Sequence, residues 1–167
     1  DYTQIVSDNG NLTYYEGYDD NGKKVIQSFT EYQDGTEYKT RIDYTDSYEA
    51  VYAEDADGEP TDVIDYFVHQ KSVYDWNKDQ DGEALSNALT IKQFTYDADG
   101  VLSQAPNLIQ TLLLGSDGEL GTQKDADDND IAGTEDQVLY VSGVDAQGRD
   151  YTQIVSDNGN LTYYEGY

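Results

Sequence analysis

Two acidic loops of this 167-residue chain carry the side chains that are best suited to bind a metal ion. Calcium takes roughly six to eight oxygen ligands, which commonly come from alternate residues of an acidic loop. The segment 125–136 places acidic or amide residues at positions 1, 3, 5 and 12 of an EF-hand-like loop, although position 6 is Asp where that loop has Gly. In the segment 75–83, Asn77, Asp79 and Asp81 fit positions 1, 3 and 5 of such a loop. Alternatively, the ligands follow a second register that begins at Asp75. We predict one Ca²⁺ site with the ligands Asp125, Asp127, Asn129 and Asp136, and a second with the ligands Asn77, Asp79 and Asp81. The alternative is that both segments are solvated acidic loops without a bound ion.

Most catalytic chemistry is disfavoured by what the sequence lacks. The chain has no Cys and a single His, so thiol catalysis, disulfides and the usual zinc-ligand sets are unavailable. His69 shares a predicted strand face with Asp65 and Phe67, where a structural role is the simpler interpretation. An oxygen-only ligand set also disfavours copper and zinc. We therefore expect that the chain is not an enzyme.

The charge balance restricts the partners of the chain. Asp and Glu number 35 against 9 Lys and Arg, which gives a net charge of −26. Phosphate groups are repelled by such a surface, so we expect neither nucleic acid nor an anionic membrane as a partner. No apolar run approaches 18 residues, so we expect no membrane insertion. The length predicts one domain with a buried core, and the absence of Met predicts a piece of a longer protein.

Dense turn sequences predict a fold built of hairpins. Asn-Gly and Asp-Gly pairs supply the positive φ values that tight hairpins need, and Tyr, Val, Ile and Thr fill the segments between them. In the segment 37–43 apolar and charged residues alternate with period two, as on a half-buried strand. We expect this phase to continue towards residue 52. The turn sequences are 8–10, 19–22, 34–35, 55–58, 97–100, 116–118 and 145–148; the residues expected on one face are Tyr38, Thr40, Ile42, Tyr44, Tyr48 and Tyr52.

The predicted fold class is therefore all-β, an antiparallel meander of long Tyr-rich hairpins with at most one short helix. A sandwich and an elongated curled sheet both satisfy the pattern. The helix candidate is the segment 83–88, and the apolar run 107–114 is of undecided type.

The two ends of the chain have the same sequence. Residues 1–18 read DYTQIVSDNGNLTYYEGY, and residues 150–167 repeat these letters without a change, 149 residues later. A period of this size is that of a domain rather than of a solenoid coil. We predict that residues 1–149 are one complete repeat unit and that residues 150–167 begin the next, with an engineered overlap as the alternative.

Short turns give the chain a family resemblance. The sequences YDDNGK (18–23) and YDADGVL (96–102), with SDNGNL (7–12) and DAQGR (145–149), resemble the Tyr-Asp hairpins of bacterial YD-repeat (Rhs-type) surface proteins. The long period and the acidic, Cys-free composition resemble the tandem extender domains of giant bacterial adhesins. These resemblances imply a structural, extracellular role at the cell surface, often with bound calcium, and they supply no catalytic residue.

The functional expectation is a structural repeat of an extracellular filament or adhesin stalk. Neighbouring copies would join head to tail, either as one covalent chain or by strand complementation. The alternative is a calcium-dependent carbohydrate-binding module that contacts surface glycans through Trp76. Asn11 begins a glycosylation sequon that recurs at Asn160. The residues predicted at the assembly interface are Tyr2, Ile5, Val6, Leu12, Tyr14 and Tyr15.

Overall fold

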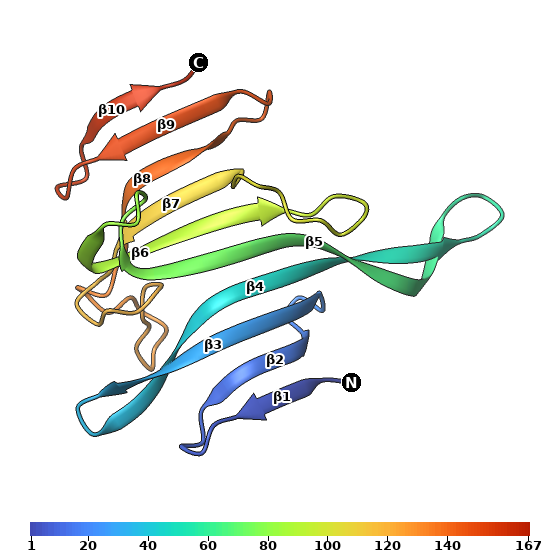
Figure 1. Ribbon diagram of the computed structural model, residues 1–167, viewed down its shortest axis with the longest axis horizontal. Helices are drawn as coiled ribbons and strands as arrows, with labels where there is room; N and C mark the ends of the chain where they lie inside the picture. Colours follow the sequence, from blue (N-terminus) through green and yellow to red (C-terminus); the bar gives the residue numbers. More distant parts are fainter. The chain divides into compact units, whose positions relative to one another are not determined.

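The computed structural model describes residues 1–167 and contains strands and loops but no helix (Figure 1). Ten strands form an antiparallel meander in which the order in the sheet is the order in the chain. This confirms the predicted all-β meander, and because the strands belong to one sheet, the sandwich alternative is not adopted. The strands are β1 (Thr3–Val6), β2 (Leu12–Tyr18), β3 (Lys24–Asp34), β4 (Glu37–Glu54), β5 (Pro60–Lys78), β6 (Ala84–Thr95), β7 (Leu108–Leu113), β8 (Gln137–Val144), β9 (Asp150–Val155) and β10 (Leu161–Glu165).

The helix expected over residues 83–88 is wrong. β6 begins at Ala84, and Ala88 pairs with Leu113 in the ladder between β6 and β7. Asn87 has a φ of 57°, which lies in the left-handed region and cannot continue a right-handed helix. The apolar run at 107–114 is the strand β7, which is paired on both sides by β6 and β8.

One five-residue turn recurs at eight places in the chain. The first residue donates its N–H to the carbonyl of the fifth at 2.7–3.0 Å, and the fourth donates to the carbonyl of the first at 2.9–3.1 Å. Seven of the turns have Gly at the fourth position with φ between 76° and 84°, where other residues are strained. The turns are 7–11, 19–23, 55–59, 79–83, 97–101, 125–129, 145–149 and 156–160.

The first residue of each turn explains why Asp is so common in the loops. In six turns an Asp Oδ1 accepts hydrogen bonds at 2.9–3.0 Å from the backbone N–H groups of the third and fifth residues. The side chain therefore satisfies backbone donors that the tight turn leaves unpaired. At Ser7 and Ser156 the hydroxyl takes the same place.

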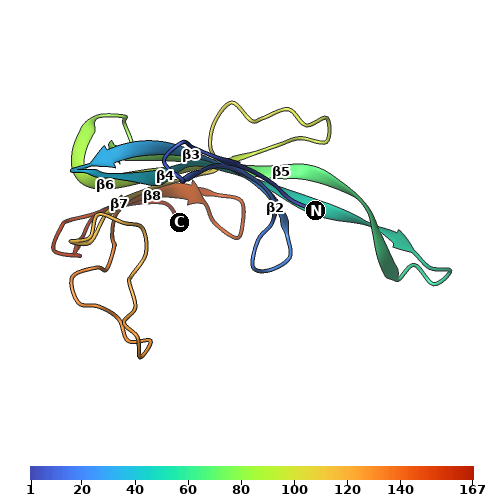
Figure 2. The same cartoon turned by 90° about the horizontal axis from the view of Figure 1, so that it is seen from below.

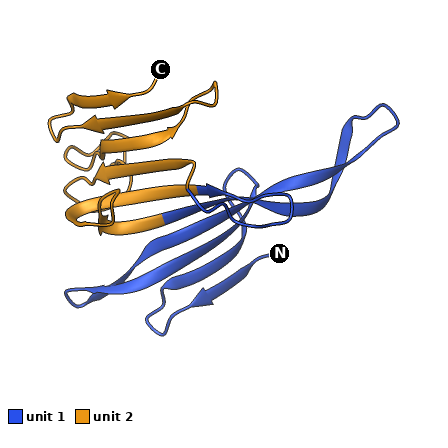
Figure 3. Ribbon diagram, turned by 45° about the horizontal axis from the view of Figure 1, so that its top comes forward, with its two compact units in different colours: residues 1–73, 94–105 blue, residues 74–93, 106–167 orange.

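The chain divides into two compact units, coloured separately in Figure 3. The first comprises residues 1–73 and 94–105, and the second comprises residues 74–93 and 106–167. In the first unit Val25 is the one buried apolar residue, and Tyr rings and long side chains cover the strands elsewhere. The expected sizeable core is therefore absent from this unit, whose stability must rest largely on strand pairing and cross-strand side-chain contacts.

A bulge changes the predicted face of β4. Tyr44 pairs with Ser28, and Ile42 pairs with Phe29, so two consecutive residues of β3 face partners that are two apart on β4. Consecutive strand residues point to opposite faces, so Tyr44 and Ile42 also lie on opposite faces. The expectation of one unbroken phase along this strand is therefore wrong, because Asp43 is the extra residue of the bulge.

The second unit has a small core beneath its longest loop. Leu89 and Ala88 of β6 and Leu112 of β7 are buried, together with Leu114 just beyond the strand. Figure 2 shows the segment between β7 and β8 leaving the strands on one side. This segment packs closely at Gly115, where an added Cβ would lie 2.4 Å from the backbone of Thr134. The loop 114–136 is thus packed against itself, and Asn87 of β6 donates its side-chain amide to the carbonyls of Leu114 and Gly115 at the start of the loop.

Candidate functional site

The repeated 18-residue segment forms the same β-hairpin at both ends of the chain. It is β1–β2 in the first copy and β9–β10 in the second, at the two ends of the ribbon in Figure 1. Both copies have the same bulge before the turn, and every pair in one copy has its counterpart 149 residues later in the other. The pairs are Thr3–Glu16, Gln4–Tyr15, Ile5–Tyr14 and Val6–Leu12, and Thr152–Glu165, Gln153–Tyr164, Ile154–Tyr163 and Val155–Leu161.

A glycine and a tyrosine fix the open end of the hairpin. An added Cβ on Gly17 would lie 2.5 Å from the Tyr15 hydroxyl oxygen, so the ring crosses the strand where only glycine leaves room. The same hydroxyl donates to the carbonyl of Tyr18 at 2.9 Å. The corresponding ring and glycine of the second copy, Tyr164 and Gly166, repeat this arrangement.

The first copy docks through its second strand. β2 pairs with β3 from Tyr14–Ser28 to Tyr18–Lys24, while β1 is the end strand of the sheet. Glu31 of β3 also reaches the turn, where its carboxylate accepts hydrogen bonds from Ser7 and from two Asn side chains at 2.5–2.8 Å. These hydrogen bonds favour the charged form and lower the pKa of Glu31.

The second copy docks through its first strand. β9 pairs with β8 from Tyr140–Ile154 to Val144–Asp150, while β10 is the end strand. At the turn, Gln137 donates its amide to the carbonyl of Ser156 at 2.5 Å. The two copies thus use opposite edges of one hairpin.

The predicted interface residues are exposed in complementary fashion in the two copies. Tyr2, just before β1, and Ile5 and Val6 on it are 54–69% exposed, whereas Leu12, Tyr14 and Tyr15 are half-buried against β3. In the second copy Leu161, Tyr163 and Tyr164 are 46–58% exposed, whereas Tyr151 and Val155 are half-buried beside β8. Each predicted interface residue except Ile5 is therefore more covered in one copy than in the other; Ile5 and its counterpart Ile154, which is 39% exposed, are open in both.

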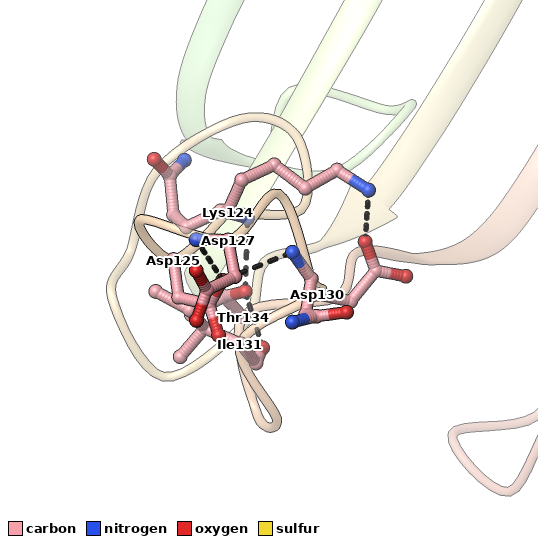
Figure 4. Close-up of polar contacts among 8 residues, drawn as sticks. Lys124, Asp125, Asp127, Asp130, Ile131 and Thr134 are labelled. Carbon is pink, nitrogen blue, oxygen red and sulfur yellow. Dashed lines mark hydrogen bonds and ion pairs between the residues drawn. The ribbon is translucent and has the colours of Figure 1, made fainter.

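In the first acidic loop the predicted calcium ligands Asp125 and Asp136 bind different backbone groups; Figure 4 shows Asp125 and Asp127 within the loop. Asp125 Oδ1 accepts the backbone N–H groups of Asp127 and Asn129, which lowers its pKa. Asp136 instead accepts a hydrogen bond at 2.5 Å from the backbone N–H of Gly121, which precedes the segment 125–136. Lys124 and Asp130 form an ion pair that closes the loop.

The second acidic loop is a turn of the common kind. Asp79 accepts the backbone N–H groups of Asp81 and Glu83, as Asp97 does in a turn with no predicted calcium. Asn77 Oδ1 accepts the N–H of Asn87 and so braces the start of β6. Nowhere in the chain do three or more acidic or His side chains lie close enough together to hold a metal ion. Calcium binding at these loops remains a prediction.

A polar cluster that the sequence did not indicate lies on one face of the first unit. The Tyr96 hydroxyl donates to Asp46 at 2.7 Å, and burial together with this carboxylate raises the pKa of Tyr96 strongly. Lys71 lies 3.8 Å from the other oxygen of Asp46 and 3.9 Å from the centre of the Tyr44 ring. The only sequence clue was the Tyr-Asp turn at 96–97, because Asp46, Lys71 and Tyr96 are far apart in the sequence; Asp46 and Lys71 are ladder partners on β4 and β5, and Tyr96 follows β6.

A surface depression is lined by tyrosines and not by Trp76, the aromatic residue predicted to contact glycans. Tyr48, Tyr52 and Tyr66 line a shallow depression of the first unit beside Lys24. Trp76, the predicted glycan contact, is half-buried in β5. His69 lies 3.3 Å from Glu49 on the neighbouring strand, and both side chains are about half exposed.

No helix of this chain could cross a membrane. No protein-family model matches the chain, and no curated protein matches it significantly.

Proposed function

We propose that this chain is a structural repeat of an extracellular filament or adhesin stalk, in which copies of the unit 1–149 follow one another head to tail. The observation that carries the proposal is the repeated hairpin, which folds identically in both copies and docks on β3 in one and on β8 in the other. A hairpin that lies between two units would use both edges at once.

The two ladders do not compete for backbone groups. The ladder to β3 uses β2, and the ladder to β8 uses β9, which corresponds to β1. In a longer chain the order …β7–β8–hairpin–β3–β4… therefore continues the meander without a gap. The edges of the hairpin would both be covered, which removes the unpaired strand edge that promotes unspecific aggregation.

The repeat has a definite length in this arrangement. Each unit contributes eight strands, β1 to β8, before the hairpin returns. At a spacing of about 4.8 Å between neighbouring strands, one unit would add roughly 38 Å along the direction of stacking. The open, non-closing contact generates fibres rather than rings.

Charge supports a role as a spacer. The second hairpin contains three acidic residues, so residues 1–149 carry 32 acids against 9 bases and a net charge of −23. Fibres of such units repel one another sideways and stay separate unless cations intervene. An external location agrees with this charge and with the absence of Cys.

The test compares chains of one, two and three units, each ended by the 18-residue hairpin, by small-angle X-ray scattering and negative-stain electron microscopy. We expect the maximum dimension to grow by a constant step of roughly 38 Å per added unit. Units that tumble independently, or particles whose length does not grow in equal steps, would contradict the proposal. Strand complementation without a covalent link predicts fibres already from the single chain at high concentration.

A carbohydrate-binding role is the second candidate, and the depression lined by three Tyr rings favours it. Aromatic faces stack on sugar rings, and Tyr52 is 51% exposed there. A glycan array should then give a signal that Tyr52→Ala abolishes, whereas Tyr38→Ala, at a similarly exposed ring outside the depression, leaves it unchanged. Absence of any glycan signal from the parent chain excludes this function.

A further inference from the structure

We propose that the hairpin at the junction of two successive repeat units is held from both sides by side chains, two from each unit. The units before and after this hairpin are called the preceding and the following copy. The residues are Gln137 and Arg149 of the preceding copy and Glu31 and Lys24 of the following copy. This inference rests on the proposed head-to-tail function. Each end of the present chain shows one half of the site, because each hairpin copy has only one neighbour.

The turn end of the hairpin offers different atoms to its two neighbours. In the first copy the Ser7 hydroxyl donates to Glu31 at 2.5 Å. In the second copy the carbonyl of the same serine, Ser156, accepts from Gln137 at 2.5 Å. One serine can therefore bind the preceding copy through its backbone and the following copy through its side chain.

Two asparagines extend the contact with the following copy. Asn9 and Asn11 each donate a side-chain amide to Glu31 at 2.8 Å. Asn11 also donates to the carbonyl of Tyr38 at 2.9 Å. A glycan on this sequon would replace one of these amide protons and obstruct the contact, so the proposed junction requires an unmodified Asn11.

The open end of the hairpin is held around its last tyrosine. In the second copy the guanidinium of Arg149 lies 4.7 Å from the centre of the Tyr167 ring, and Asp145 orients it through a 3.1 Å contact. In the first copy the same ring, Tyr18, meets the edge of Tyr66 at 6.2 Å and pairs across the ladder with Lys24. The preceding copy thus places a cation directly on this ring, whereas in the following copy Lys24 lies over Tyr66, 5.4 Å from its centre, and Tyr66 in turn meets Tyr18.

At this end each neighbouring copy places one basic side chain near the two carboxylates of the hairpin, and Arg149 is also paired with Asp145. In the first copy a depression is lined by Asp1 and Glu16 with Lys24 as its one basic side chain. In the second copy the corresponding Asp150 and Glu165 face Arg149 instead. A junction hairpin would bring two carboxylates together with two cations. In a unit with only nine bases, this use of two of them at one junction favours joining over the strong general repulsion.

The experiment uses the chain 1–167 extended by a second copy of residues 19–167, so that the hairpin 150–167 becomes internal. Glu31→Gln is introduced in the second unit only, and hydrogen–deuterium exchange of the internal hairpin is followed by mass spectrometry. Labelling residues 1–167 with ¹⁵N and selecting peptides that begin in β8 distinguishes this hairpin from its identical copies. We expect its turn amides to exchange roughly three- to tenfold faster, because charge-assisted hydrogen bonds are lost.

Matched controls separate the junction from general destabilisation. Glu54→Gln in the second unit removes the same charge at the exposed end of β4, outside the junction, and should leave exchange of the internal hairpin unchanged. Arg149→Ala in the first unit should raise exchange at the open end, and Arg149→Lys should raise it less. In the single 167-residue chain, Glu31→Gln should affect residues 1–18 and leave residues 150–167 unchanged.

The outcomes distinguish this inference from the proposed function. If the extended chain lengthens by the expected step but its internal hairpin ignores Glu31→Gln, the side-chain site is wrong and the filament proposal stands. If scattering shows two independent units, both are overturned. Circular dichroism of each variant checks that the β-sheet is retained.

Discussion

A single turn geometry gives six of the loop aspartates the same pair of backbone partners. Asp79 and Asp125 were predicted calcium ligands, yet each binds two backbone N–H groups as Asp55 and Asp97 do in loops assigned to turns from the start. The alternation of acidic residues that suggests a cation site also follows from a five-residue turn with Asp first and Gly fourth. Sequence alone does not separate the two patterns, because the same oxygen atoms serve both.

Asp128 occupies the position that is Gly in the seven other turns, with a φ of 65°. Left-handed backbone is costly for a residue with a Cβ, so we expect Asp128→Gly to stabilise the chain by roughly 0.5–1 kcal/mol. The reverse change, Gly100→Asp, should destabilise it by a similar amount. Denaturant unfolding measures both; a loss of stability in Asp128→Gly would show that the Asp128 side chain makes a compensating contact.

Calcium binding can be separated from turn formation by a matched pair of variants. If the loop 125–136 binds Ca²⁺, millimolar CaCl₂ should raise the melting temperature of the parent, and Asp125→Ala should remove that increase. Asp97→Ala loses the same turn hydrogen bonds and should keep the increase. Differential scanning calorimetry with CaCl₂ and with EGTA makes the comparison, and equal melting temperatures of the parent in both would exclude the predicted sites.

Tyr96 predicts how the fold responds to alkaline pH. Its folded-state pKa is raised above the ordinary value of 10.0, mainly by burial and then by the hydrogen bond to Asp46. The unfolded chain therefore loses this proton first, so the stabilisation is complete below about pH 10 and is lost as the pH rises through the folded-state pKa. Tyr96→Phe should flatten this dependence while Tyr38→Phe leaves it unchanged, as followed by chemical denaturation between pH 8 and 11; equal slopes would contradict the assignment.

At the scale of elements, the long hairpin β4–β5 has two different environments. β3 pairs with β4 only as far as Ser47. Beyond Ser47, β4 has β5 as its ladder partner (Figure 1). Val51, Ile64 and Phe67 in this arm are exposed. Two-stranded ribbons are marginally stable in water, so the arm must depend on the strands at its base.

We therefore expect a gradient of hydrogen exchange along β4. Backbone amides of residues 48–54 should exchange faster than those of residues 44–47, because the latter are paired with both β3 and β5. Exchange measured by NMR on the 167-residue chain tests this. Uniform protection along β4 would show that another surface covers the arm in solution.

The sequence predicts the elements better than their details. Tyr- and Val-rich segments between Asp-Gly turns were sufficient for an antiparallel meander, since turn chemistry and period two are local properties. The bulge at Asp43 reversed the face of Tyr44 because a bulge depends on the fit between two strands, which alternation within one strand cannot report. The cluster of Tyr96, Asp46 and Lys71 was missed for the same reason.

For the molecule as a whole, the repeated termini were the most informative sequence feature. Identity between residues 1–18 and 150–167 predicted a shared element; of the predicted contact residues, Ile5 and Tyr14 are paired on its two strands, and their role in assembly stays a prediction. Which strand each edge meets could not be read from the sequence. The ladders show that one edge pairs with β3 and the other with β8, two strands that are far apart in the sequence.

Net charge predicts a strong response to salt. With −26 charges on a chain that has few buried apolar residues, self-repulsion opposes folding. We expect the melting temperature to rise by several degrees when NaCl is raised from about 10 mM to about 150 mM, because the Debye length falls from roughly 30 to 8 Å. Tetramethylammonium chloride should act equally well. A rise seen only with divalent salts would point to specific cation binding.

The identical hairpins have a consequence for how the length of such a protein can change. Because the same 18 residues fit β8 on one edge and β3 on the other, a gene that gains or loses a whole unit creates no new interface and disturbs no old one. A substitution within the hairpin, by contrast, must suit two neighbours at once. In the proposed head-to-tail arrangement, length would therefore change in whole units while the joining sequence stays fixed.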